Sequence, residues 1–386
     1  MTSNNATPID PTETKNNGSP VPVRSRFSGC LLAGAVGDAL GASVEFDSHA
    51  QIRARFGDDG ITDYAPAYGR IGAITDDTQM TLFTAEGMLR GHVRWSLKGI
   101  CDRISVVTGA YLRWLATQGA CNRHGLGESV NELTGWLVGH DDLHHRRGPG
   151  NSCLSSLLGK RSFADVVTDD RKGCGGVMRA APVGLFGWRR HGPQPLDEVF
   201  EFGCATAAIT HGHPTGQLSA GVFAALVCLL VDGQDLGTAV QTAIELLVVR
   251  DDHHETLAAL NKAIELAESD TPRSDAIRSL GQGWIAEEAL AIGVYCALVA
   301  DDIRDGLLLA VNHSGDSDST GSITGNLLGA QLGQGAIPLA WRDRLELRDV
   351  ITEVATDLHD YRDWSFSDEA ADADSTEHIW HKYPGH

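Results

Sequence analysis

Two stretches of the chain, 29–41 and 321–333, place a small residue at every fourth position. The residues are Gly29, Ala33, Gly37 and Gly41 in the first stretch and Gly321, Gly325, Gly329 and Gly333 in the second. Residues four apart lie on one face of an α-helix, so each stretch predicts a helix with a smooth stripe. Since glycine has no Cβ, another backbone can approach such a stripe closely. We expect the two helices to pack against each other.

Apolar segments of helical length follow throughout the chain, and alternating strand patterns are almost absent. The segments are 78–91, 98–118, 125–138, 195–209, 216–232, 235–249, 255–267, 284–300, 303–312 and 344–358. The sequence therefore predicts an all-α fold, a single compact multi-helix domain over residues 26–362. Residues 1–25, rich in Thr, Asn, Ser and Pro, predict a disordered leader. Residues 363–386 form a C-terminal tail whose aromatic end either docks onto the domain or stays free.

The charge and the cysteines restrict the class of protein. The chain has 31 Lys plus Arg against 51 Asp plus Glu, a net charge of −20, so we expect no extended nucleic-acid surface and no attraction to an anionic membrane. The eight cysteines are scattered without a Cys-x-x-Cys pair, which is typical of a reduced intracellular protein. No secretory signal is recognisable, and the longest strongly apolar run, 218–231, is shorter than the ~20 residues that span a bilayer. We expect a cytoplasmic protein.

Residues 316–320 gather two carboxylates and three hydroxyls. Such hard oxygen ligands suit Mg²⁺ or Mn²⁺ better than zinc. Asp316 and Asp318, two positions apart, do not share a helix face, so they converge only in a loop or an irregular first turn, with Ser319 near the N-cap. Taken alone, the stretch also fits a solvated loop that caps a helix.

A second acidic cluster, Thr75-Asp76-Asp77-Thr78, precedes a predicted helix. Thr75 or Asp76 suits the N-cap, yet adjacent carboxylates repel unless a cation shares them. The two clusters together supply enough oxygens for two octahedral ions completed by water. Glu45, just after the first small-residue helix, fits either a mobile acid at a pocket mouth or an ordinary surface glutamate.

Five motifs spread over about 27–335 occur in the order seen in the ADP-ribosylglycohydrolase family, which the chain therefore resembles. They are Gly37-Asp38-Ala-Leu-Gly41 with Glu45, Thr75-Asp76-Asp77-Thr78, Gly173-Cys-Gly-Gly-Val-Met178-Arg179, Thr210-His211-Gly-His213-Pro214 and Gly315-Asp316-Ser-Asp318-Ser319. The family includes dinitrogenase-reductase-activating glycohydrolases and ADP-ribosylarginine and ADP-ribosylserine hydrolases. The resemblance implies an all-helical fold with a dinuclear centre of two Mg²⁺ ions, or Mn²⁺ as a substitute, and removal of ADP-ribose from a modified acceptor.

The resemblance also implies roles for particular residues. The implied metal ligands are Thr75, Asp76, Asp77, Asp316, Asp318 and Ser319. The implied catalytic residues are Asp76, Asp77, Glu45 and Asp318, with Asp318 bridging the two ions and Glu45 as a movable acid. Two positions depart from the family pattern: Ser319 replaces a Thr of many relatives, and Cys174 replaces an Asn.

The glycine loop 173–176 is a suitable diphosphate cradle, since bare backbone N–H groups can approach phosphate oxygens, although taken alone it also fits an ordinary turn. The resemblance implies that ADP-ribose contacts Gly150, Asn151, Ser152, Gly173, Cys174, Gly175, Gly176, Met178 and His211. His211 fits a pocket wall and the core equally well, whereas we expect His213 in the core.

The resemblance implies a Mg²⁺-dependent hydrolase that frees ADP-ribose from protein arginine, the best-represented acceptor of the family. Serine-linked and nucleobase-linked (guanine) ADP-ribose are alternative substrates. A non-catalytic ADP-ribose-binding or immunity protein that acts by occlusion is a further alternative, as is hydrolysis of another glycosidic or phosphate bond.

Overall fold

The computed structural model describes residues 20–129, 132–366 and 373–385. Over these ranges the chain is helical and contains no strand, only two isolated bridges, Ala67 with Arg70 and Gly173 with Ile285. The predicted all-α class is therefore confirmed. Residues 1–19 of the predicted leader lie outside the described part, and the first helix begins at Val23, inside the range predicted to be disordered.

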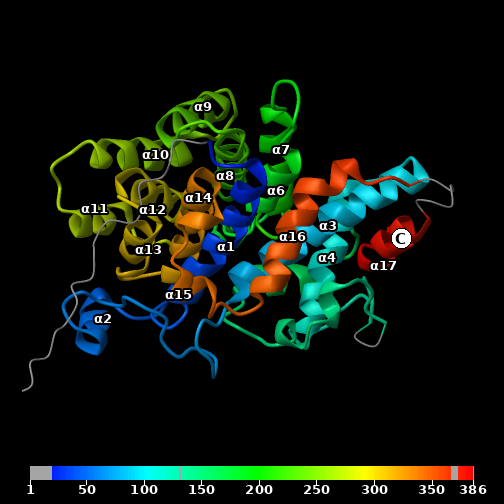
Figure 1. Cartoon of the computed structure of the whole chain (residues 1–386), viewed down its shortest axis with the longest axis horizontal. Coiled ribbons are helices and arrows are strands. Elements are labelled where there is room, and N and C mark those ends of the chain that lie inside the picture. The colour runs from blue at the N-terminus through cyan, green and yellow to red at the C-terminus, as the bar shows by residue number, and fades with distance from the viewer. Residues whose placement is uncertain (1–19, 130–131, 367–372, 386) are drawn as a thin grey trace, which may run out of the picture.

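The longer helices, shown in Figure 1, are α1 (Val23–Gly41), α3 (Asp76–Lys98), α4 (Arg103–Thr117), α7 (Leu196–Ala208), α8 (Pro214–Asp232), α9 (Leu236–Val248), α10 (His254–Ala267), α12 (Ala286–Val299), α14 (Ser317–Leu332), α16 (Arg348–Asp360) and α17 (Ala373–Lys382). The shorter ones are α2 (His49–Phe56), α5 (Asn151–Gly159), α6 (Ala181–Gly187), α11 (Arg273–Leu280), α13 (Ile303–Val311) and α15 (Leu339–Arg342).

The two small-residue helices, α1 and α14, lie side by side at the centre of the molecule (Figure 1). Their stripes face each other in antiparallel register: Gly29 meets Gly329, Ala33 meets Gly325, and Gly37 meets Gly321. A Cβ added to any of these glycines would lie closer than 3.0 Å to the backbone of the opposite helix. The predicted packing is confirmed, because each crossing leaves no room for a Cβ on the glycine that faces the opposite backbone.

Helix α8 runs through the core beside this pair. It is long and apolar enough to cross a bilayer by length and composition, but 89% of its most apolar window is buried inside the protein. A helix that is apolar all round fits the centre of a large helical domain. Helices α6, α7, α9 and α12 pack around it.

The helix predicted over 125–138 is wrong. In the described residues of this range the chain forms loop and bends, with a 3₁₀ turn only at Leu137–Gly139. Gly125, Gly127 and Gly135 adopt positive φ angles of 70°, 89° and 101°, which an α-helix does not contain. The apolar side chains of this range therefore pack against the core from a loop and not from a helix.

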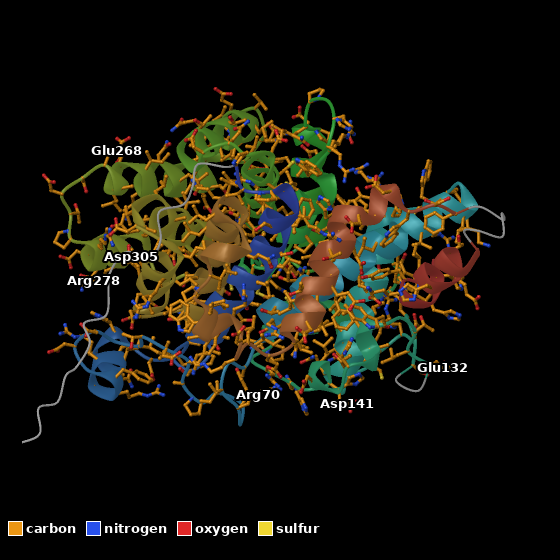
Figure 2. The ribbon with its side chains drawn as sticks, in the orientation of Figure 1. Arg70, Glu132, Asp141, Glu268, Arg278 and Asp305 are labelled. Atoms are coloured by element: carbon orange, nitrogen blue, oxygen red, sulfur yellow. The ribbon has the colours of Figure 1, made fainter. Side chains whose placement is uncertain are left out.

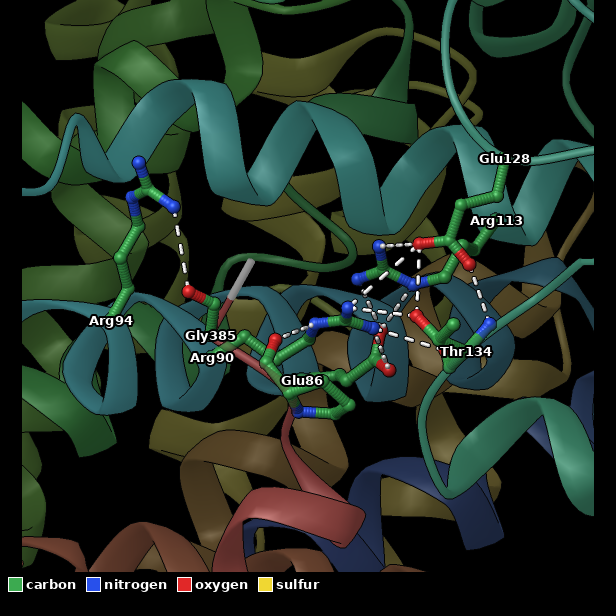
Figure 3. Close-up of polar contacts among 8 residues, drawn as sticks. Glu86, Arg90, Arg94, Arg113, Glu128, Thr134 and Gly385 are labelled. Carbon is green, nitrogen blue, oxygen red and sulfur yellow. Dashed lines mark hydrogen bonds and ion pairs between the residues drawn. The ribbon is translucent and has the colours of Figure 1, made fainter. Parts of the chain in front are cut away.

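The C-terminal end docks onto the domain, which is one of the two alternatives left open by the sequence. Tyr383 is fully buried and donates a hydrogen bond from its hydroxyl to Asp357 Oδ2 at 2.6 Å. Arg90 of α3 donates from Nε to the carbonyl of Pro384 at 2.8 Å (Figure 3). Helix α17 and residues 383–385 therefore form part of the folded body.

Candidate active site

The two acidic clusters meet in one pocket of about 190 Å³. Its lining includes Glu45, Asp76, Asp77, Asp316, Asp318 and Ser319 together with Gly150, Asn151, Ser152, Gly173, Cys174, Gly175, Met178 and His211. Of the site residues predicted from the sequence, Thr75 and Gly176 do not line the pocket; both are buried next to residues that do. The structure thus brings the predicted set to one place.

The first cluster sits at the start of α3, where Thr75 is the N-cap and accepts a hydrogen bond from the Asp77 N–H at 3.3 Å. Asp38 of α1, fully buried, accepts from the backbone N–H groups of Thr75 at 3.0 Å and Thr78 at 3.1 Å. Because Asp38 satisfies these helix-end N–H groups, the carboxylates of Asp76 and Asp77 remain free to face the pocket.

The second cluster is formed by the irregular start of α14. Asp316 is the N-cap residue, outside helical geometry at φ −77° and ψ 71°, and Asp318 lies in the first turn. The expectation of an irregular turn is confirmed, but Asp316 and not Ser319 holds the cap position. The Asp316 N–H donates to the carbonyl of Gln282 at 2.8 Å, and the Cys174 thiol donates to Asp316 Oδ2 at 2.8 Å.

The acidic groups fit a bound metal. Glu45, Asp316 and Asp318 each offer an oxygen, and these oxygens lie within 4.8 Å of one another. Glu45 Oε2 and Asp77 Oδ1 are buried without a hydrogen-bond partner among the described residues. A carboxylate without a donor in such a place is stabilised when it coordinates a cation, and a set of carboxylate and hydroxyl oxygens suits a hard divalent ion.

Electrostatics support the same conclusion. Burial, followed by the charges of Asp318 and Asp316, raises the pKa of Glu45 to about 10. Burial and then the charge of Asp318 likewise raise the pKa values of Asp76 and Asp77. The described lining of the pocket contains no lysine or arginine to oppose these charges. Divalent cations would supply the missing positive charge.

Gly173, Cys174 and Gly175 of the glycine loop line the same pocket, and the loop contains the 3₁₀ turn Cys174–Gly176. A Cβ added to Gly175 would lie 2.9 Å from Cys153 Sγ and 3.2 Å from the His211 ring, so only glycine fits there. Burial lowers the pKa of His211 to about 3, and its Nδ1 lies 2.9 Å from Thr210 Oγ1. His211 is therefore a neutral ring that is both buried and part of the pocket wall.

His213, expected in the core, is only partly buried. It is the N-cap of α8, where its Nδ1 accepts from the Thr215 N–H at 3.2 Å. The expectation was wrong because a histidine next to Pro214 can cap a helix through its ring nitrogen.

The pocket rim contains an aromatic pair that the sequence did not indicate. Trp284 lines the pocket, and its ring stacks on Phe46 with centroids 5.8 Å apart and planes at 16°. Phe46 is 76% exposed and directly follows Glu45. No local pattern connects two aromatics so far apart in the chain.

A buried ion pair supports the loops around the pocket. Arg147 Nη2 donates to Glu346 Oε1 at 2.8 Å, and both side chains are buried. Glu346 Oε2 also accepts from the Ile74 N–H at 3.0 Å, and the Arg147 carbonyl accepts from the Asp76 N–H at 3.0 Å. The pair therefore fixes the backbone on both sides of the first acidic cluster.

A larger cavity of about 660 Å³ lies between α2, α11 and α13. Two of its arginines are already paired, Arg273 with Asp305 and Arg278 with Asp275. The cavity contains none of the carboxylates that converge in the smaller pocket. We therefore assign the site to the smaller pocket.

Comparisons with known proteins agree with this fold. The family model described as ADP-ribosylglycohydrolase matches residues 19–367. Over 330 residues the chain is 24% identical to ADP-ribosyl-(dinitrogen reductase) glycohydrolase of Rhodospirillum rubrum, covering 84% of this chain and 92% of that protein. It is 25% identical over 333 residues to ADP-ribosylarginine hydrolase Tri1 of Serratia proteamaculans, covering 86% and 78%.

A solved structure titled ADP-ribosylglycohydrolase-related protein complex has the same fold, with a TM-score of 0.63 at 24% identity over 88% of this chain and 98% of that one. The family match covers far more than half of the sequence. The chain belongs to the ADP-ribosylglycohydrolase family, whose enzymes hydrolyse glycosidic bonds of ADP-ribose.

Proposed function

We propose that this protein is a Mg²⁺-dependent hydrolase that frees ADP-ribose from modified arginine side chains of proteins. The observation that carries the proposal is the convergence of Glu45, Asp316 and Asp318 in a pocket that the glycine loop also lines. The name of one relative, an ADP-ribosylarginine hydrolase, supports arginine as the acceptor, and the name of another, a dinitrogen reductase glycohydrolase, supports a protein substrate. The acidic surface fits a cytoplasmic protein without a membrane partner.

The first step of the argument concerns the metal. Two Mg²⁺ ions, or Mn²⁺ in their place, would be held by Thr75, Asp76, Asp77, Asp316, Asp318 and Ser319. When bound, the ions supply positive charge that binds ribose hydroxyls and stabilises negative charge near the scissile bond. The carboxylates that would bind the ions lie in fixed positions. Asp38 of α1 fixes the start of α3, and the contact of α1 with α14 fixes the start of α14.

The second step concerns the diphosphate. Gly173, Cys174 and Gly175, together with the start of α5 at Asn151, line the same pocket as the carboxylates. The Cys174 N–H already donates to the Trp284 carbonyl at 3.1 Å, so the candidate donors for the diphosphate are the N–H groups of the two glycines and of the start of α5. Such N–H groups bind phosphate oxygens, and a helix N-terminus adds partial positive charge. With the diphosphate there, Ser152, Met178 and His211 would complete the wall around ADP-ribose.

The third step is bond cleavage. The C1″ bond to the acceptor nitrogen breaks as water attacks, and positive charge develops on the ribose. The carboxylates lie beside this charge and stabilise it. One of Glu45, Asp76 and Asp77 takes the proton from the attacking water, and the same or another of these carboxyl groups gives a proton to the leaving nitrogen, so that the hydroxyl of water ends on C1″ and its proton on the acceptor.

The experiment is to incubate the protein with arginine-, serine- and guanine-linked ADP-ribose, each with Mg²⁺ or EDTA, and to measure free ADP-ribose. We expect Mg²⁺-dependent release from the arginine-linked substrate. Asp318→Ala and Asp77→Asn should lose at least ~10²-fold in turnover. Asp58→Asn, whose carboxylate is 96% exposed, is the matched control and should retain turnover.

Thermal unfolding with and without Mg²⁺ tests metal binding independently of any activity assay. Mg²⁺ at about 100 times its Kd should stabilise the wild type by about 2.7 kcal/mol, and Asp77→Asn should abolish most of this gain. If ADP-ribose is released only from the serine-linked or only from the guanine-linked substrate, that residue and not arginine is the acceptor. Tight ADP-ribose binding with no release from any substrate would favour an occluding protein.

A further inference from the structure

Tyr68 stands at the edge of the pocket in a strained backbone conformation. Ala67 and Arg70 exchange backbone hydrogen bonds of 3.1 and 3.0 Å, so Tyr68 and Gly69 are the two central residues of a tight turn. Both have positive φ, 49° at Tyr68 and 83° at Gly69. Asn, Asp or Gly is usual at the first of these positions, and a bulky aromatic there costs free energy. Such an outlier indicates a functional constraint.

The turn holds the Tyr68 hydroxyl beside the catalytic carboxylates. A Cβ added to Gly148 would lie 3.0 Å from the Tyr68 hydroxyl and 3.6 Å from both Asp76 Oδ1 and Glu45 Oε2. Three oxygens therefore surround the bare Cα of Gly148. Glu45 Oε2 is buried and without a hydrogen-bond partner among the described residues. Glu45 Oε2 is therefore an unpaired acceptor close to the Tyr68 hydroxyl.

Gly148 and the glycine loop adjoin different parts of the pocket wall. The neighbours of Gly175 are Cys153 and the His211 ring, whereas those of Gly148 are Tyr68, Asp76 and Glu45. With the diphosphate at the glycine loop and the ribose at the carboxylates, the acceptor falls on the Gly148 side. Tyr68 also lines an open hollow of about 600 Å³, which leaves room for the rest of an acceptor protein.

We propose that Tyr68 contacts the acceptor and, with the free Glu45 oxygen, selects a guanidinium over a hydroxyl-linked acceptor. The inference rests on the proposed function. A guanidinium is a planar cation with several N–H donors, so it can donate to the Tyr68 oxygen and to Glu45 Oε2 and lie near an aromatic ring. A serine acceptor offers neither the charge nor these donors.

The test compares wild type and Tyr68→Phe, with Mg²⁺, on ADP-ribosylated agmatine and on a peptide ADP-ribosylated at serine. For the agmatine substrate we expect kcat/KM to fall about tenfold or more, the effect of one hydrogen bond to a charged group. For the serine peptide, and for ADP-ribose binding measured by calorimetry, we expect less than about twofold change. Equal losses on both substrates, or none on agmatine, would overturn the inference while leaving the hydrolase intact.

Wild type that releases nothing from ADP-ribosylated agmatine would instead overturn the proposed function, and this inference with it. Tyr68→Gly separates function from folding. Because glycine relieves the strain, this variant should have a higher unfolding midpoint together with the same loss of kcat/KM on agmatine.

Asp252→Gly is the matched control, since Asp252 is exposed, has φ 57° and lies outside the pocket. It should raise the unfolding midpoint without changing kcat/KM. A Tyr68→Gly protein that unfolds at a lower midpoint than wild type would assign Tyr68 a structural role and overturn the inference.

Discussion

Gly41 of α1 lies directly against the backbone of Asp318 in α14, and no space for a Cβ remains between them. The contact places the end of one small-residue helix against the first turn of the other, where the second acidic cluster stands. The packing of the two helices and the position of a candidate metal ligand therefore depend on the same glycine.

Gly41→Ala tests this dependence. The added methyl should lower the free energy of unfolding by about 1–3 kcal/mol, the usual cost of overpacking, and should weaken Mg²⁺ binding because Asp318 moves. Urea unfolding and calorimetric titration measure the two effects. Gly335→Ala, where a Cβ meets nothing within 4 Å, is the control and should leave both unchanged. A stable Gly41→Ala protein with normal Mg²⁺ affinity would refute the proposed coupling.

Cys174 should be chemically inert although it lines the pocket. Burial, and next the charge of Asp316, raises the pKa of the Cys174 thiol well above its usual range, so the reactive thiolate is scarce at neutral pH. With iodoacetamide at pH 7.5 in EDTA, mass spectrometry should find the exposed Cys121 alkylated well before Cys174. Comparable alkylation of both cysteines would show that the thiol is not held as described.

Glu86 balances two buried arginines beneath the C-terminal segment (Figure 3). Its Oε2 accepts from Arg113 Nη2 at 2.9 Å and its Oε1 from Arg90 Nη1 at 3.3 Å. Glu86→Gln leaves that positive charge without its buried partner and should destabilise the protein by about 3–5 kcal/mol in urea unfolding. Glu268→Gln, at the periphery in Figure 2, is the control and should change stability by less than about 0.5 kcal/mol.

His92 should make stability depend on pH. Burial, and then the charges of Arg362 and Arg103, lowers the pKa of His92 to about 4, below its usual 6.5. Between these values the unfolded chain binds a proton that the folded chain does not, so this contribution is present above pH 6.5 and is lost as the pH falls toward 4. His92→Gln, measured with Mg²⁺ in excess, should therefore lose less stability than wild type between pH 7 and 5. Parallel curves for the two proteins would contradict this assignment.

Much of the scaffold could be predicted from the sequence because its signals are local. The fourfold spacing of glycine in α1 and α14 depends only on helix geometry, and the apolar segments matched α7 to α10 closely for the same reason. The segment 125–138 failed because positive-φ glycines interrupt the chain there, and apolar spacing does not report backbone angles.

The sequence alone determined which residues of the two acidic clusters offer carboxylate and hydroxyl oxygens to a metal. Each cluster is a short run of neighbouring residues, so its composition can be read directly from the sequence. It did not determine that Asp38 would satisfy the N-terminus of α3, that Trp284 would stack on Phe46, or that Tyr68 would stand over Gly148. Each of these contacts joins segments far apart in the chain. Their distances follow from how the helices pack around α1 and α14, so no single stretch of sequence contains them.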